Sequence, residues 1–134
     1  MKLIIGGACQ GKTAYLTDQF GISKGYILDG GKMAEMGLNR RKMAAVNHLH
    51  LYIRKCLEKG NTQQEIQTEI LSWLEEVPDL ILVSDEIGYG IVPMDAFERE
   101  YREAAGRICC MLAQKADMVI RVCCGLGNVI KGEK

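Results

Sequence analysis

Eight residues near the N-terminus have the types and the spacing of a phosphate-binding loop. They fit the pattern of a glycine, four residues of any type, and then Gly-Lys-Ser/Thr: Gly6, Gly7, Ala8, Cys9, Gln10, Gly11, Lys12 and Thr13. Glycines let backbone amides curl around phosphate oxygens, and a following helix points its unpaired amides at the anion. The pattern therefore predicts a nucleoside triphosphate, ATP or GTP, bound by all eight residues. Lys12 would reach the β- and γ-phosphates and act in catalysis, and the Thr13 hydroxyl would bind Mg²⁺.

Two acids at the end of an apolar stretch could complete such a site. Residues 79–85 are a continuous apolar run bounded by acids, and Asp85 and Glu86 close it. Enzymes with this loop need an acid at a strand end to hold Mg²⁺, and a second acid can orient or deprotonate the attacking group. We predict Asp85 as the metal-side acid and Glu86 as the catalytic base, with the two roles open to exchange. The alternative is a pair of solvated acids in a turn.

Two further groups of residues are weaker candidates. His48 and His50 are predicted on one helix, where side chains two positions apart point in nearly opposite directions. A shared metal site is therefore not expected. One of the two could be a functional histidine, but a ring on the surface or partly packed is the expectation for each. Arg40, Arg41 and Lys42 could bind a phosphate of a second substrate or lie on a solvated helix face.

Strands that alternate with helices must position these residues. Apolar runs predict strands at residues 2–5, 25–29, 79–85 and 118–123. Helical spacing predicts helices at about 11–20, along the apolar stripe 46–57 that Gly60 ends, at 62–77, and from Asp95 onward. Residues 32–39 could be a helix or a loop, and a loop is expected at 125–127. This order predicts an α/β fold with a mainly parallel sheet in a three-layer sandwich.

Composition narrows the class of protein. The chain has 134 residues with 17 basic and 17 acidic side chains, values that suit a single domain over residues 1–134. Zero net charge argues against a nucleic-acid partner, which needs a basic surface. No apolar run approaches the ~20 residues of a membrane span, and the N-terminal run is shorter than a secretory signal. We therefore expect a cytoplasmic protein without a membrane partner, and its six cysteines, none in a Cys-x-x-Cys pair, as reduced thiols.

Longer segments are more specific than the loop alone. Residues 3–8 and Gly11-Lys12-Thr13 form the first, and Ser84-Asp85-Glu86-Ile87-Gly88-Tyr89-Gly90-Ile91-Val92-Pro93 forms the second. Residues 101–107, 116–117, 125–126 and 130–131 follow in a matching order. Together these segments, somewhat under half of the chain, resemble the bifunctional adenosylcobinamide kinase/adenosylcobinamide-phosphate guanylyltransferases of cobalamin biosynthesis.

The resemblance implies a RecA-like P-loop NTPase fold and transfer of a γ-phosphoryl group from ATP or GTP to the aminopropanol hydroxyl of adenosylcobinamide. It also implies a corrinoid partner and a homo-oligomer. The family's GMP-accepting histidine lies near an Arg-Pro-x-x-Trp segment that this chain lacks. The resemblance therefore supports the kinase half, and a shortened member, rather than the guanylyltransferase half. Two alternatives stay open: a subunit that binds nucleotide for regulation or assembly without transferring a group, and a small kinase for an unrelated substrate.

Overall fold

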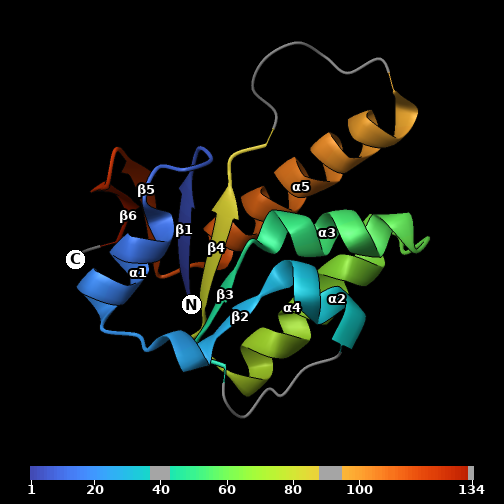
Figure 1. Cartoon of the computed structure of the whole chain (residues 1–134). Coiled ribbons are helices and arrows are strands. Elements are labelled where there is room, and N and C mark those ends of the chain that lie inside the picture. The colour runs from blue at the N-terminus through green and yellow to red at the C-terminus, as the bar shows by residue number, and fades with distance from the viewer. Residues whose placement is uncertain (37–42, 88–94, 133–134) are drawn as a thin grey trace.

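The computed structural model describes residues 1–36, 43–87 and 95–132 (Figure 1). These residues form a six-stranded sheet in the order β2-β3-β4-β1-β5-β6. The neighbouring strands are parallel except β5 and β6, which are antiparallel. The strands are β1 (Lys2–Gly6), β2 (Ile27–Asp29), β3 (Ala45–Asn47), β4 (Ile81–Asp85), β5 (Met118–Cys123) and β6 (Leu126–Lys131). The predicted α/β fold with a mainly parallel sheet is thus confirmed.

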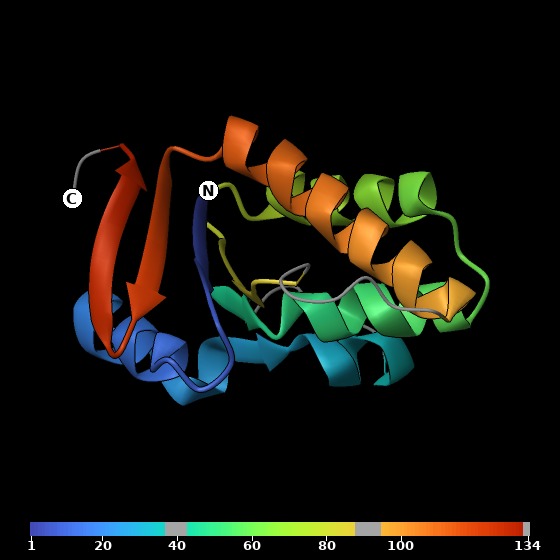
Figure 2. The ribbon, with the colours of Figure 1, turned by 90° about the horizontal axis from the view of Figure 1, so that it is seen from above.

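Helices cover both faces of this sheet and give the predicted three layers. They are α1 (Lys12–Phe20), α2 (Gly30–Met36), α3 (Leu49–Glu58), α4 (Gln63–Glu76) and α5 (Ala96–Lys115). Helix α1 packs Tyr15 and Leu16 on one face, and α3, α4 and α5 form the larger core on the other (Figure 1). Figure 2 shows α5 running diagonally past α3 and α4 toward the β5–β6 hairpin.

The two central strands are buried on both faces. In β1, Leu3 joins the core under α3 to α5, and its neighbour Ile4 joins the core under α1. In β4, Leu82 and Val83 divide between the two cores in the same way. Successive strand residues point to opposite faces, so a strand covered on both sides has no polar face. This explains why residues 79–85 lack the alternation of a half-exposed strand.

Side chains cap the N-termini of helices α4 and α5. The Thr62 hydroxyl accepts from the amide of Glu65, and the Glu65 carboxylate accepts from the amide of Thr62, both at 3.1 Å. The Asp95 carboxylate accepts from the amide of Glu98 at 3.1 Å at the start of α5. These side chains satisfy amides that would otherwise lack partners at a helix start. Both helices therefore begin where expected.

The middle of the chain differs from the expected single helix. Ala45–Asn47 is strand β3, which lies between β2 and β4, and α3 begins only at Leu49. A strand of three residues is too short to show a period of two, and Val46 happens to continue the helical spacing of α3. Strand β2 ends at Asp29 as expected, but it begins only at Ile27. Helix α2 starts directly after it, at Gly30, and covers the ambiguous segment as far as Met36.

The expected loop at 125–127 is also wrong, because Leu126 already belongs to β6. Cys124 and Gly125 make the turn, with φ of 51° and 76°. Two positive φ values suit the tightest hairpin turns. Strand β6 lies at the sheet edge with Leu126 75% exposed and Ile130 56% exposed. Its sequence therefore lacks the apolar run by which buried strands were found.

Among the described residues, no helix is long and apolar enough to cross a membrane.

Candidate active site

The predicted phosphate-binding loop connects β1 to α1. Gly6 ends β1, and Gly11 precedes α1 with φ of 88°. Cys9 also has a positive φ, 60°. A Cβ on Gly6 would lie 2.4 Å from the carbonyl oxygen of Val122, so only glycine fits there. The loop borders a pocket of about 300 Å³ whose described walls are Ala8, Cys9, Gln10, Gly11, Lys12, Thr13, Ala14, Asn47, His48 and Asp85.

The structure brings Lys12 and Asp85 together inside this pocket. Lys12 Nζ lies 2.7 Å from Asp85 Oδ1 and donates to the carbonyl oxygen of Gly7 at 2.6 Å. Only 7% of the Lys12 side chain is exposed. The sheet fixes the pair, because Gly6 of β1 stands opposite Asp85 of β4 in the parallel register. A cation and a carboxylate thus meet in the wall of the loop pocket.

Thr13 has a partner that the sequence did not indicate. Asn47 Nδ2 donates to the Thr13 hydroxyl at 3.0 Å. Asn47 Oδ1 accepts from the amide of His48 at 2.9 Å, so the Asn47 side chain is held at both ends. Asn47 ends β3. Because that strand was read as part of a helix, nothing in the sequence placed this amide beside the loop.

His50, one of the two histidines that the sequence indicated only weakly, also belongs to the site, and it is buried rather than on the surface or partly packed. Its side chain is 8% exposed, and its Nδ1 accepts from the amide of Asp85 at 3.2 Å. Its Nε2 lies 3.4 Å from Asp85 Oδ2. Burial lowers the pKa of His50, although the Asp85 carboxylate acts to raise it. A neutral ring with the proton on Nε2 satisfies both contacts. His50 thus touches both the backbone and the side chain of Asp85.

The two histidines do not point apart as expected. Their ring centroids are 5.8 Å apart in an edge-to-face arrangement. His48 lies outside the helix, at its N-cap, and its φ of 55° turns the chain before α3 begins. Helical geometry therefore does not apply between these two positions. His48 Nδ1 lies 3.5 Å from Asp29 Oδ1 at the end of β2.

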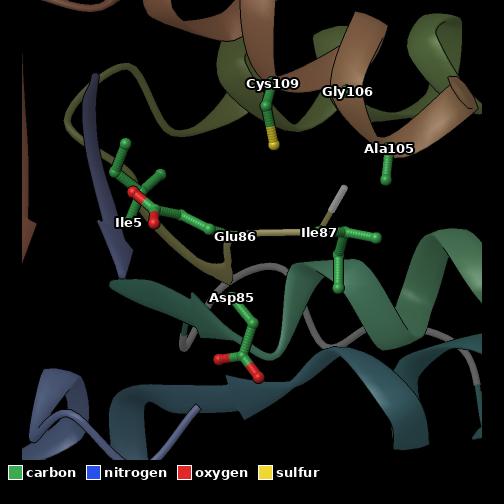
Figure 3. Close-up of a pocket in the computed structure, with 7 residues that line it drawn as sticks. All are labelled: Ile5, Asp85, Glu86, Ile87, Ala105, Gly106 and Cys109. Carbon is green, nitrogen blue, oxygen red and sulfur yellow. The ribbon is translucent and has the colours of Figure 1, made fainter. Parts of the chain in front are cut away.

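Glu86 points away from the loop. Figure 3 shows the carboxylates of Asp85 and Glu86 directed to different sides. Glu86 Oε1 lies 2.9 Å from Arg121 Nε, and Arg121 Nη2 donates to Glu86 Oε2 at 3.0 Å. Its backbone amide donates to the carbonyl oxygen of Gly6 at 2.8 Å. Glu86 therefore borders a second cavity, which lies between the carboxyl ends of β1 and β4 and the middle of α5, rather than the loop pocket. Its role as a base stays a prediction.

The β5–β6 turn supports the loop from the far side. Gln10 accepts twice from this turn: its side-chain oxygen from the amide of Cys124 at 2.7 Å, and its carbonyl from the amide of Gly125 at 2.8 Å. A Cβ on Gly11 would lie 3.2 Å from Gly125 Cα. The β5–β6 hairpin, which the sequence did not predict, thus supports the phosphate-binding loop through Gln10.

The donor atoms fit Mg²⁺ bound together with a nucleotide. Within 1–36, 43–87 and 95–132, no group of three or more His, Cys, Asp or Glu residues could hold a metal ion. Thr13 and Asp85 supply oxygen atoms at the pocket wall. Mg²⁺ commonly takes one or two protein oxygens and completes its shell with phosphates and water. The Thr13 hydroxyl and the Asp85 carboxylate could supply such protein oxygens.

Two sets of predicted residues lie outside the described ranges. They are the basic cluster Arg40, Arg41 and Lys42, and the part of the second resemblance segment from Gly88 to Pro93.

We expect His50→Leu to lower the free energy of unfolding by about 1–3 kcal/mol. The leucine removes the acceptor of the Asp85 amide, and an unsatisfied buried donor costs about that much. Urea denaturation measures the loss. The matched variant His48→Leu, at a side chain 42% exposed, should lose clearly less. Nitrogen NMR at neutral pH should also show the proton of His50 on Nε2, and a cationic ring would contradict this account.

A parallel α/β sheet with a glycine-rich loop between its central strand and α1 has the architecture of a P-loop NTPase. Comparison with protein families gives a more specific result. The model of the CobU family, cobinamide kinase / cobinamide phosphate guanyltransferase, matches residues 30–130, and the chain belongs to this family. The matched range begins after the loop, so the loop assignment rests on its own motif and geometry.

Curated relatives agree with the family assignment. The bifunctional adenosylcobalamin biosynthesis protein CobU of Salmonella typhimurium is 40% identical over 67 residues, and that of Escherichia coli is 39% identical. The bifunctional adenosylcobalamin biosynthesis protein CobP of Pseudomonas aeruginosa is 37% identical over 65 residues. The matches cover 48–50% of this chain and span only 37–38% of the relatives' own length.

Proposed function

We propose that the protein is a Mg²⁺-dependent kinase that transfers the γ-phosphoryl group of ATP or GTP to a hydroxyl of adenosylcobinamide. The observation that carries the proposal is the contact between Lys12 and Asp85 at the head of the glycine-rich loop. A buried cation beside converging amides stabilises phosphate charge, and an adjacent carboxylate suits a metal ion. Membership of the cobinamide kinase family supports the choice of acceptor.

Each residue of the loop pocket has a proposed task. The amides of residues 6–13 and the Lys12 ammonium would hold the β- and γ-phosphates and stabilise charge on the group in transfer. Thr13 and Asp85 would hold Mg²⁺, which when bound neutralises charge on the phosphates. Asn47 fixes the Thr13 hydroxyl, and His50 fixes Asp85. These contacts hold the donor groups in place before a substrate arrives, which lowers the cost of reorganisation.

Glu86 is the proposed base for the acceptor. It borders the second cavity rather than the loop pocket, which suits a residue that meets the acceptor instead of the nucleotide. Arg121 holds its carboxylate in one orientation. Guanylyl transfer is not part of the proposal. We also propose that the chain self-associates, and the exposed Leu126 and Ile130 on the edge strand β6 support this.

The experiment is a reaction of the purified protein with adenosylcobinamide, Mg²⁺ and ATP or GTP, analysed by mass spectrometry. The proposal predicts a corrinoid that gains one phosphate and no GDP-linked product. A second candidate is a subunit that binds nucleotide without transferring a group, for which the loop pocket alone would suffice. Bound nucleotide with no phosphorylated product would overturn the kinase and favour that subunit.

A further inference from the structure

The β5–β6 turn carries two adjacent cysteines that the proposed function does not use. Cys123 ends β5, Cys124 follows it in the turn, and both residues are exposed. Cys124 has a φ of 51°, and Gly125 after it has a φ of 76°. Cys123 stands opposite Leu126 in the pairing of β5 with β6. Two neighbouring thiols therefore lie at the exposed tip of this hairpin.

The turn is attached to the phosphate-binding loop through Gln10. The amide of Cys124 donates to Gln10 Oε1 at 2.7 Å, and the amide of Gly125 donates to the Gln10 carbonyl oxygen at 2.8 Å. A Cβ on Gly11, the next loop residue, would lie 3.2 Å from Gly125 Cα. Gln10 and Gly11 are both walls of the loop pocket. A change in the backbone of the turn therefore reaches the pocket directly.

A disulfide between the two cysteines does not fit the turn in its present shape. Adjacent Cα atoms lie about 3.8 Å apart across a trans peptide, whereas disulfide-linked residues usually have Cα atoms roughly 4.4–6.8 Å apart. The ring that such a bond closes contains the N–Cα bond of Cys124, so the bond constrains the φ of Cys124. The present turn needs that φ to be positive. Disulfide formation and the contacts to Gln10 therefore compete for the same backbone.

The other cysteines do not combine an exposed thiol with a neighbour that can react with it. Cys109 and Cys110 are adjacent, but they lie in α5, where the side chains of consecutive residues do not face each other. Burial raises the pKa of Cys109 and of Cys56, and a thiol that keeps its proton reacts slowly. Cys9 is exposed in the loop but has no adjacent cysteine. Oxidation-sensitive sites commonly place an accessible thiol beside a second one that resolves the product.

We propose that Cys123 and Cys124 are an oxidation site that controls the loop pocket, with hydrogen peroxide as the oxidant. One thiol gives up its proton, and its sulfur attacks a peroxide oxygen. The O–O bond breaks, a sulfenic acid forms, and the leaving hydroxide takes the proton to become water. The second thiol sulfur attacks the sulfenic sulfur, so that the S–S bond forms, the S–O bond breaks and a second water leaves. Both sulfur atoms are oxidised and both peroxide oxygens are reduced.

The disulfide withdraws the turn from Gln10, and the loop then binds phosphate less tightly. A small-molecule thiol reverses the change by thiol–disulfide exchange. A strained, exposed disulfide is the kind that such a reductant opens readily. The effect on nucleotide binding rests on the proposed function, whereas the oxidation and the change in the turn do not.

Serine substitutions test the site with little change in shape. Cys123→Ser and Cys124→Ser each remove one thiol and keep the backbone amides that contact Gln10. Cys110→Ser, at an exposed position in α5, is the matched control. Each protein is treated with a stoichiometric amount of hydrogen peroxide, and its free thiols are alkylated. Mass spectrometry of the peptide that contains residues 123–124 is then compared before and after reduction with dithiothreitol.

In wild-type protein we expect this peptide to lose two hydrogen atoms and to resist alkylation until it is reduced. The Cys124 and Gly125 amides, followed by NMR, should exchange with solvent about tenfold faster, because each loses its hydrogen bond to Gln10. The affinity for the Mg²⁺–triphosphate complex, measured by calorimetry, should fall about tenfold and return on reduction. Cys110→Ser should respond as the wild type does, whereas Cys123→Ser and Cys124→Ser should keep both exchange rates and affinity.

Three results would overturn the proposal. They are no disulfide in treated wild-type protein, a disulfide that joins Cys9 or a second chain instead, and a disulfide between Cys123 and Cys124 that leaves the exchange of the two amides unchanged. Peroxide sensitivity that persists in both turn variants would also overturn it and would point to Cys9. Failure of the proposed nucleotide site gives a different result, because the untreated protein would then bind no triphosphate. The peptide mass and the amide exchange would still decide whether the turn is an oxidation site.

Discussion

Lys12→Ala is expected to lower the rate of phosphoryl transfer roughly 10³-fold. The substitution removes the ammonium group that contacts the Asp85 carboxylate. The His50 ring, which lies beside the same carboxylate, is neutral and does not replace that charge. One preorganised group that stabilises transition-state charge is worth about 10²- to 10³-fold in rate, and a buried full charge lies at the upper end. Steady-state assays of phosphate transfer with saturating nucleotide measure the loss in kcat.

The fold of this variant must be checked, because Asp85 loses its ion-pair partner. Removing one member of a buried pair destabilises a protein by leaving the other uncompensated. Thermal unfolding and the second variant Lys12→Gln, which keeps a long polar side chain, separate lost catalysis from lost structure. Lys24→Ala, at an exposed position before β2, is the matched control and should retain full activity. A folded Lys12→Ala protein with wild-type kcat would contradict the proposed role.

Asp85→Asn is expected to reduce transfer by roughly 10²- to 10³-fold and to raise the Mg²⁺ concentration needed for half-maximal rate. The amide keeps the size of the side chain but supplies no negative charge to the metal ion or to Lys12. The measurement is the rate as a function of Mg²⁺ concentration. A second readout, the binding of Mn²⁺ by the nucleotide complex in EPR, does not depend on turnover.

The matched control for this variant lies at the other end of the same strand. Asp79 precedes β4 and is exposed, so Asp79→Asn should leave the Mg²⁺ dependence unchanged. Glu86→Gln distinguishes the two acids. If Asp85 is the metal-side acid and Glu86 the base, Glu86→Gln lowers kcat without changing the Mg²⁺ requirement. The reverse pattern would exchange the two roles.

The elements nearest the loop could be predicted because each leaves a local signal in the sequence. The glycine pattern of residues 6–13, the two-sided burial of β4 and the caps at Thr62 and Asp95 depend on neighbours within a few positions. Local physics therefore places β1, α1, β4, α4 and α5 and puts Asp85 at the end of its strand, whereas the parallel pairing of β1 with β4 brings Asp85 beside the loop.

The elements that the sequence did not predict depend on hydrogen bonds between residues far apart in the chain. Strand β3 has three residues and is defined by hydrogen bonds to β2 and β4, not by its own pattern. Asn47 and His50 reach the site only because that strand and the positive φ of His48 turn the chain there. Strand β6 exists because the Cys124–Gly125 turn folds it onto β5. Such long-range contacts leave no period in the sequence.

The account depends above all on the loop as a site for the phosphates of a nucleotide. The most direct measurement is a calorimetric titration of the protein, with Mg²⁺, with ATP and GTP and with the nucleosides adenosine and guanosine. We predict that at least one triphosphate binds, that removal of Mg²⁺ weakens it, and that neither nucleoside binds measurably. Equal binding of a triphosphate and its nucleoside, or no binding of either triphosphate to folded protein, would contradict the account.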